Sequence, residues 1–240
     1  MKKILLQLLC AAFISTGFCA CSPSDDPVKD DPSTENPDNP GQPENPTPDP
    51  TPTPDPDPAP TPDPEPSAEK TLIAYYSYTN NVHTIVSDLS AQIEADVVRV
   101  EPAEKGLDYA ANNYAIGSAQ IQAIRNNPND ASSYPAIDPV NIDLKQYGTV
   151  IVAAPLWWSN MAAPMQSFLF KYGPEMAGKK IGLIVSSASS GISGVESDAK
   201  RLIPDGSFLT PSQWIRSSQT SSCHSLNTEW LANTGIVPAS

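Results

Sequence analysis

The stretch Thr149-Val150-Ile151-Val152-Ala153-Ala154-Pro155-Leu156-Trp157-Trp158-Ser159-Asn160 says most about how this chain folds. Its first six residues are apolar or β-branched, which is typical of a short strand buried on both faces of a parallel sheet. The run then changes to a proline, two tryptophans and polar residues, so the strand ends and a loop begins. In open parallel sheets, ligands bind at the edge formed by such loops. The segment Pro155–Met161 is therefore a candidate binding loop.

Two more apolar runs end in loops of the same kind. Thr71–Tyr76 is followed by Ser77-Tyr78-Thr79-Asn80-Asn81-Val82, and Lys180–Ser186 is followed by Ser187-Ala188-Ser189-Ser190-Gly191. Each loop precedes a segment with the pattern of a helix. Because the carboxyl ends of parallel strands share one edge of a sheet, we expect the three loops to lie together.

The first loop is suited to hold a phosphate group. A phosphate at a helix N-terminus meets backbone N–H groups without partners and the positive end of the helix dipole. Ser77 and Thr79 add hydroxyl donors, and Asn80 and Asn81 tolerate the left-handed backbone of a tight turn. The alternative is that Thr79, Asn80 or Asn81 only caps the following helix. The sequence here lacks the glycine-rich run and lysine of a nucleoside triphosphate loop.

The second loop predicts a surface for a flat ring. Neighbouring residues of an extended chain point to opposite sides, so Trp157 and Trp158 are not both expected in the core. A tryptophan beside a pocket suits stacking on a heteroaromatic ring, although core packing of either residue is the alternative. The third loop, Ser187–Gly191, has small side chains that permit close approach of a ligand, and Gly191 permits a positive φ. A plain surface turn would have the same composition.

The chain from residue 71 onward alternates between strand and helix patterns. The expected strands are Thr71–Tyr76, Val97–Val100, Thr149–Ala154 and Lys180–Ser186, with a weak edge strand within 207–216. The expected helices are Val82–Ile93, a short one around Ala110–Ile124, Ala162–Tyr172, Val195–Leu202 and Leu226–Thr234. Residues 102–146 otherwise form a long polar excursion. This alternation predicts an α/β fold, a doubly wound parallel sheet with helices on both faces.

The residues before this domain predict a leader and a linker. Lys2 and Lys3 precede an apolar run too short to span a bilayer, as in a signal peptide. Between Pro23 and Pro66 lie 17 of the 27 prolines, in a stretch with almost nothing apolar to bury. We therefore expect a signal segment at 1–20, a disordered tether at 21–68 and a folded domain at 69–240. A spacer role is favoured for the tether, and a ligand for a proline-binding domain is the alternative.

The segment Phe18-Cys19-Ala20-Cys21-Ser22 resembles a bacterial lipobox. That resemblance implies that Cys21 becomes the lipidated N-terminus, which would anchor the protein to a membrane outside the cytoplasm. An ordinary signal peptide cut nearby is the alternative. Ser24-Asp25-Asp26 is similar to acidic signals that send some Gram-negative lipoproteins to the outer surface.

Charge and cysteine content exclude several classes of function. The net charge of -13 divides into -9 for residues 1–68 and -4 for residues 69–240, which gives no case for nucleic-acid binding. Cys223 is the only cysteine of the folded part, so no internal disulfide is possible there. Its neighbour His224 suggests no metal or catalytic site, because no further Cys, His or acid pattern accompanies the pair. A serine hydrolase is disfavoured, since the sequence has no Gly-x-Ser-x-Gly elbow and both His83 and His224 suit a surface role.

From Lys70 to Val237 the sequence resembles bacterial flavodoxin-type domains. Ser77–Val82 stands where that family has a Ser-x-Thr-Gly-Asn-Thr phosphate loop, and Ala154–Ser159 stands where it has Tyr-Pro-Ile-Trp-Trp-Gly. Ser186–Gly191 matches a Thr-Ser-Gly-Gly-Ser-Gly loop. The resemblance implies a flavodoxin-like sheet of five parallel strands in the order 2-1-3-4-5 and a non-covalently bound flavin mononucleotide (FMN).

The resemblance also assigns roles to residues. The implied cofactor-binding residues are Ser77, Thr79, Asn80, Asn81 and the N–H of Val82 for the phosphate; Pro155, Leu156, Trp157, Trp158, Ser159, Asn160 and Met161 around the isoalloxazine; and Ser187, Ala188, Ser189 and Gly191 at its other edge. Five positions depart from the family pattern. Asn80 and Ser159 replace glycines, Val82 replaces threonine, and Ala188-Ser189 replaces a glycine pair.

We therefore expect a lipid-anchored, extracytoplasmic protein that binds FMN and transfers electrons. The resemblance leaves open a one-electron carrier or an NAD(P)H:quinone reductase, and it names no electron donor or acceptor. The three loops contain no Lys or Arg, which predicts a neutral pocket and a low reduction potential. The altered loops motivate the alternative, a non-redox module that binds another ligand on the same scaffold.

Overall fold

The fold is that of a computed structural model, in which residues 70–236 are described. The predicted signal segment, Cys21 and the predicted tether at 21–68 lie outside the described residues. Within the described part the elements, in chain order, are β1 Lys70–Tyr75, α1 Asn81–Gln92, β2 Asp96–Arg99, α2 Ala111–Asn126, η1 Ala131–Ser133, η2 Leu144–Gln146, β3 Tyr147–Trp157, β4 Asn160–Met161, α3 Ala163–Tyr172, η3 Gly173–Met176, β5 Lys180–Ser187, α4 Ser193–Leu202, β6 Ser207–Phe208, β7 Gln213–Arg216, η4 Ser217–Ser222 and α5 Cys223–Thr234.

The strands form one parallel sheet in the order β2-β1-β3-β5-β6, and β7 continues the edge beside β5. Since β6 and β7 together take the place of the fifth strand, the predicted order 2-1-3-4-5 is confirmed. The edge strand is split because Pro211, between β6 and β7, has no N–H to donate to the ladder.

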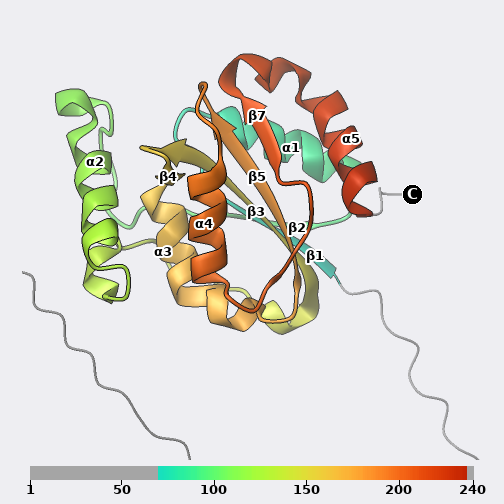
Figure 1. Cartoon of the computed structure of the whole chain (residues 1–240), viewed down its shortest axis with the longest axis horizontal. Helices are drawn as coiled ribbons and strands as arrows, with labels where there is room; N and C mark the ends of the chain where they lie inside the picture. The colour runs from blue at the N-terminus through green and yellow to red at the C-terminus, as the bar shows by residue number, and fades with distance from the viewer. Residues whose placement is uncertain (1–69, 237–240) are drawn as a thin grey trace, which may run out of the picture. The chain divides into compact units, whose positions relative to one another are not determined.

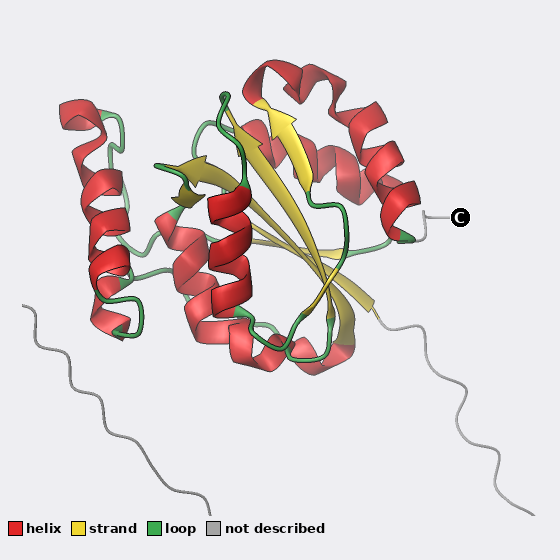
Figure 2. Ribbon diagram, viewed as in Figure 1, coloured by secondary structure: helices red, strands yellow, loops and turns green. Residues whose placement is uncertain are grey.

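Each face of the sheet has its own helical layer (Figures 1 and 2). Alternate residues of a strand point to opposite faces. In β1, Leu72 and Ala74 pack with α3 and α4, whereas Ile73 and Tyr75 pack with α1 and α5. Helix α2 lies further out, beside α3 and the end of β3. The doubly wound architecture is thus confirmed.

Two differences from the sequence predictions shape the binding edge. Strand β3 does not end at Ala154 but runs to Trp157, and β4 folds back on it as a short antiparallel hairpin, with Leu156 opposite Met161. Helix α2 begins with three residues in left-handed geometry, Asn112, Asn113 and Tyr114. The predicted loop Pro155–Met161 is therefore mostly strand, and the predicted excursion contains an unusual turn.

Candidate functional site

The first loop leaves β1 after Tyr75 and enters α1 at Asn81. Asn80 immediately before the helix is left-handed, with φ 64°, which asparagine tolerates better than most residues. The hydroxyl of Ser77 accepts a hydrogen bond from the His83 N–H at 3.1 Å, inside the first turn of α1. Among residues 70–236, the N–H groups of Thr79 to Val82 have no hydrogen-bond acceptor. Those donors are free to bind an anion at the helix N-terminus.

An arginine lies beside this loop. Arg99, at the end of β2, donates through Nη2 to the Ser77 carbonyl oxygen at 3.4 Å and pairs through Nε with Glu101 at 2.5 Å. Its guanidinium lies 5.9 Å from the centre of the Tyr75 ring. The prediction of a neutral pocket counted only residues within the loops. The structure instead places charges of both signs next to the phosphate-type loop.

The second loop is a two-residue turn between β3 and β4. Trp157 pairs with Asn160, and the turn residues Trp158 and Ser159 have φ 45° and 66°. Two left-handed residues in succession are the geometry of a type I′ hairpin, which favours Asn-Gly. A glycine at position 159, as in the resembling motif, would take up this conformation without a steric penalty.

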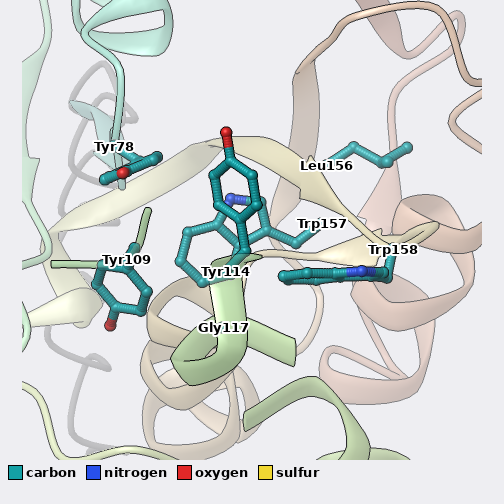
Figure 3. Close-up of a pocket in the computed structure, with 7 residues that line it drawn as sticks. All are labelled: Tyr78, Tyr109, Tyr114, Gly117, Leu156, Trp157 and Trp158. Atoms are coloured by element: carbon teal, nitrogen blue, oxygen red, sulfur yellow. The ribbon is translucent and has the colours of Figure 1, made fainter. Parts of the chain in front are cut away.

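The hairpin forms one wall of an aromatic hollow of about 200 Å³ (Figure 3). Its lining residues are Tyr78, Tyr109, Tyr114, Gly117, Leu156, Trp157 and Trp158. None of these side chains carries a charge at neutral pH, so the hollow suits a flat, uncharged ring.

The two tryptophans take different positions in this wall. Trp157 is partly buried and packs edge-on against Tyr76 and Tyr78. Trp158 is 41% exposed. A Cβ added at Gly117 of α2 would lie 3.1 Å from the Trp158 ring, so this glycine allows the ring to rest on the helix. The sequence prediction that the two tryptophans are not both in the core agrees with their burial, but both rings line the same hollow, because Trp158 lies in a left-handed turn and not in an extended strand.

The third loop does not line this hollow. The Ser187 hydroxyl donates to the Ser190 carbonyl oxygen at 2.9 Å and accepts from Trp214 Nε1 at 2.8 Å. Ala188, Ser189 and Gly191 are exposed. Gly191 does not adopt a positive φ, although it lacks a Cβ. The structure thus brings the first two loops together at the hollow and leaves the third beside them.

The structure adds residues that the sequence did not assign to the site. Tyr109, Tyr114 and Gly117 come from the polar segment between β2 and β3, and Tyr78 comes from the first loop. Aromatic residues in an otherwise polar segment were the available signal. Burial raises the pKa of Tyr76 and of Tyr109, so both remain protonated at neutral pH.

The side chains of Cys223 and His224 do not form a common site. Cys223 is buried, and burial together with the nearby Asp88 carboxylate raises the pKa of its thiol. His224 is exposed and contacts Asp88 Oδ2 through Nδ1 at 2.9 Å. Within residues 70–236, no three His, Cys, Asp or Glu side chains are grouped to hold a metal ion.

Comparison with known proteins fits this geometry. The family model for flavodoxin matches residues 70–234. The chain belongs to the flavodoxin family. No curated protein matches it. None of the described helices of this flavodoxin-family chain is long and apolar enough to cross a membrane.

Solved structures show the same fold. A putative flavoprotein from Bacteroides eggerthii is 22% identical, with a TM-score of 0.56 over 70% of this chain and 99% of that one. A putative flavoprotein from Bacteroides uniformis is 21% identical, with a TM-score of 0.52 over 66% and 97% of the two chains. A Lactobacillus acidophilus flavoprotein in complex with FMN is 21% identical, with a TM-score of 0.51 over 65% and 98%.

Proposed function

We propose that this protein binds FMN at the carboxyl edge of its sheet and transfers electrons through it. The observation that carries the proposal is the meeting of two features at that edge. The first loop offers free N–H donors at a helix N-terminus, and the adjacent hairpin offers an uncharged aromatic hollow. Tyr78 belongs to the first loop and also lines the hollow, so the two features are continuous. A phosphate joined to a flat ring system matches this pair of subsites.

The first loop would hold the phosphate. Within residues 70–236, its backbone donors from Thr79 to Val82 have no hydrogen-bond acceptor. The hydroxyl of Thr79 accepts from Asn81 Nδ2 at 3.3 Å, and its own O–H donates to no acceptor there. Ser77 would act indirectly, because its hydroxyl already accepts from the His83 N–H and so fixes the loop. Asn80 supplies the left-handed turn.

The hairpin would hold the isoalloxazine ring. Trp157 or Trp158 stacks on the ring, while Pro155, Leu156, Ser159, Asn160 and Met161 form or support the wall. Ala188, Ser189 and Gly191 are exposed and available for the far edge of the ring, whereas Ser187 holds the third loop in shape. When bound, the flavin supplies the electron-transfer chemistry, and the protein supplies position and electrostatics.

We further propose that the protein is lipid-anchored at Cys21 in a bacterial cell envelope, with residues 21–68 as a spacer. This rests on the lipobox-like segment and on the proline-rich composition alone. The electron donor and acceptor are redox partners of unassigned identity.

The first test is an absorption spectrum of the purified full-length protein, before and after FMN is added and the excess removed. We expect flavin bands in a one-to-one ratio with protein. A colourless protein that does not retain FMN would overturn the proposal and favour the alternative, a non-redox binding module on the same scaffold.

The phosphate assignment has its own variant. Thr79→Ala with Asn81→Ala removes side-chain donors from the first loop, and each lost hydrogen bond is worth about 0.5–1.5 kcal/mol. We expect FMN affinity to fall by about tenfold in a fluorescence titration. Unchanged affinity in the double variant would place the phosphate elsewhere.

A further inference from the structure

The tip of the β3–β4 hairpin has an unfavourable backbone. Trp158 and Ser159 both adopt left-handed φ values although neither is glycine. The left-handed conformation is unfavourable for such residues, and it persists only where the surroundings fix it. Trp158 is also the exposed wall of the aromatic hollow. Whatever holds this turn therefore also sets the position of the ring that a ligand would meet.

Arg125, in the last turn of α2, binds the turn from one side. Its guanidinium donates to the Trp158 carbonyl oxygen and, at 2.8 Å, to Asn160 Oδ1. The planar fork of arginine suits two acceptors held at a fixed spacing. The Arg125 side chain thus links Trp158, the first residue of the turn, to Asn160, the residue that follows the turn.

Asp198 of α4 binds the hairpin from the other side. Asp198 is 6% exposed, and its Oδ2 accepts hydrogen bonds from Asn160 Nδ2 and from the Met161 N–H, both at 2.9 Å. Asn160 is therefore held at both ends of its amide, by Arg125 and by Asp198. A buried carboxylate needs such donors, because an unpaired charge would be costly.

A second tier of contacts orients Asp198. Arg201 donates through Nη2 to Asp198 Oδ1 at 3.3 Å and to Gln166 Oε1 at 2.8 Å. Gln166 is 1% exposed and donates through Nε2 to the Met161 carbonyl oxygen at 2.7 Å. Three helices, α2, α3 and α4, thus converge on a turn of two residues.

We propose that Arg125 and Asp198 are positioning residues for the ring-binding wall. They hold the strained Trp158-Ser159 turn, and with it the indole ring that closes the hollow beside Gly117 (Figure 3). The identity of the ring as isoalloxazine rests on the proposed function. The existence of the held wall does not, so the two ideas are tested separately.

The wall itself is tested on the full-length protein without added ligand. Trp157 and Trp158 lie 6.4 Å apart at an interplanar angle of 77°, which is close enough for their near-ultraviolet circular dichroism to report their relative position. We expect Arg125→Gln to reduce that signal by about half, and Arg125→Lys to retain most of it. Arg125 is exposed, so the variant keeps its fold. Lys200→Gln, which removes an exposed cation from α4, is the matched control and leaves the signal unchanged.

Asp198→Asn gives a second, independent arm. The substitution keeps the size of the side chain but replaces one carboxylate oxygen, a hydrogen-bond acceptor, with an NH₂ group, which is a donor. We expect the same loss of tryptophan circular dichroism signal. In the double variant, Arg125→Gln with Asp198→Asn, we expect the loss of signal to be smaller than the sum of the two single losses, because both residues act through Asn160. An unchanged signal in Arg125→Gln, or strictly additive losses, would overturn the proposal.

Ligand binding distinguishes a positioning role of Arg125 from a role in fold stability alone. Riboflavin and FMN share the ring, so Arg125→Gln should weaken both by the same factor, about tenfold. A variant that lowers the melting temperature yet leaves both affinities unchanged would reduce Arg125 to a structural role. If the wild type binds neither flavin, the proposed function fails, while the circular dichroism arm still decides whether the wall is held.

Discussion

Gly194 allows the tip of the β3–β4 hairpin to touch helix α4. A Cβ built on Gly194 would lie 1.8 Å from the Ser159 carbonyl oxygen, a distance that no side chain can occupy. The residue thus belongs to the same support as Asp198, which follows it in α4. We expect Gly194→Ala to lower the free energy of unfolding by about 1–3 kcal/mol, since overpacking forces the backbone to move. Thermal unfolding measures this.

The matched control for that substitution is Gly191→Ala, three residues earlier. Nothing lies within 4 Å of a Cβ built there, and its φ is not positive. The control should unfold at the wild-type temperature. Equal melting temperatures for the two variants would show that the hairpin tip does not press on α4.

Arg99 is the second residue whose role can be isolated. Its guanidinium lies against the first loop through the Ser77 carbonyl oxygen and would face a phosphate held there. We expect Arg99→Gln to weaken FMN binding by about fivefold, which corresponds to about 1 kcal/mol. Riboflavin has no phosphate, so its affinity should not change. Equal losses for FMN and riboflavin would show that Arg99 acts on the loop and not on the phosphate.

At the scale of whole elements, helices α1 and α5 are joined by a polar clasp around Asp88. Asn227 Nδ2 donates to Asp88 Oδ1 at 2.8 Å and to the Ile85 carbonyl oxygen at 3.0 Å, and Gln92 Nε2 donates to Asp88 Oδ1 at 2.6 Å. Burial alone would raise the pKa of Asp88. The hydrogen bonds from Asn227, His224 and Gln92 together outweigh it and hold the pKa below its usual value.

This clasp predicts an acid-sensitive contribution to stability. A carboxyl group whose pKa is depressed in the folded state stabilises the fold above its unfolded pKa of about 3.9, and that stability is lost as pH falls through the folded pKa. We expect the melting temperature of the wild type to drop more steeply below about pH 4 than that of Asp88→Asn. Glu94→Gln, at an exposed acid just after α1, should keep the wild-type slope. Parallel slopes for all three proteins would contradict the assignment.

The helices and strands also show how much of the structure could be predicted from the sequence. The strands and the three loops followed from apolar runs, because a strand buried on both faces has a strong local pattern. The order of the strands in the sheet came only from the resemblance to flavodoxin-type domains. The hairpin at Trp158-Ser159 did not follow from such a pattern, since its turn lacks the Asn-Gly signal and is held by Arg125 and Asp198, which lie far away in the chain. The residues of α2 that line the hollow could not be predicted from the sequence for a related reason. Tyr114 enters it from a left-handed turn that propensity does not favour.

The whole molecule divides its charge unevenly. Residues 1–68 carry -9 of the net -13, so most of the repulsion lies in the predicted tether and not in the flavodoxin-family domain. A proline-rich chain of about 45 residues in polyproline II geometry reaches on the order of 140 Å when fully extended. If residues 21–68 act as the proposed spacer, their first residue must be fixed to a surface. That requirement agrees with the lipobox-like segment, which ends at Cys21.

Lipid attachment at Cys21 can be tested on the whole chain. Cys21→Ser removes the thiol that would carry the lipid, and we expect the protein to leave the membrane fraction and to lose labelling by a fatty-acid analogue in the bacterial host. Cys19→Ser is a close control, because it changes a cysteine two residues away and should leave both readouts unchanged. Flavin content should be equal in both variants, since the domain from residue 70 onward is untouched. If Cys21→Ser protein remains lipid-labelled, the lipid is attached elsewhere and residues 21–68 do not act as a spacer from Cys21.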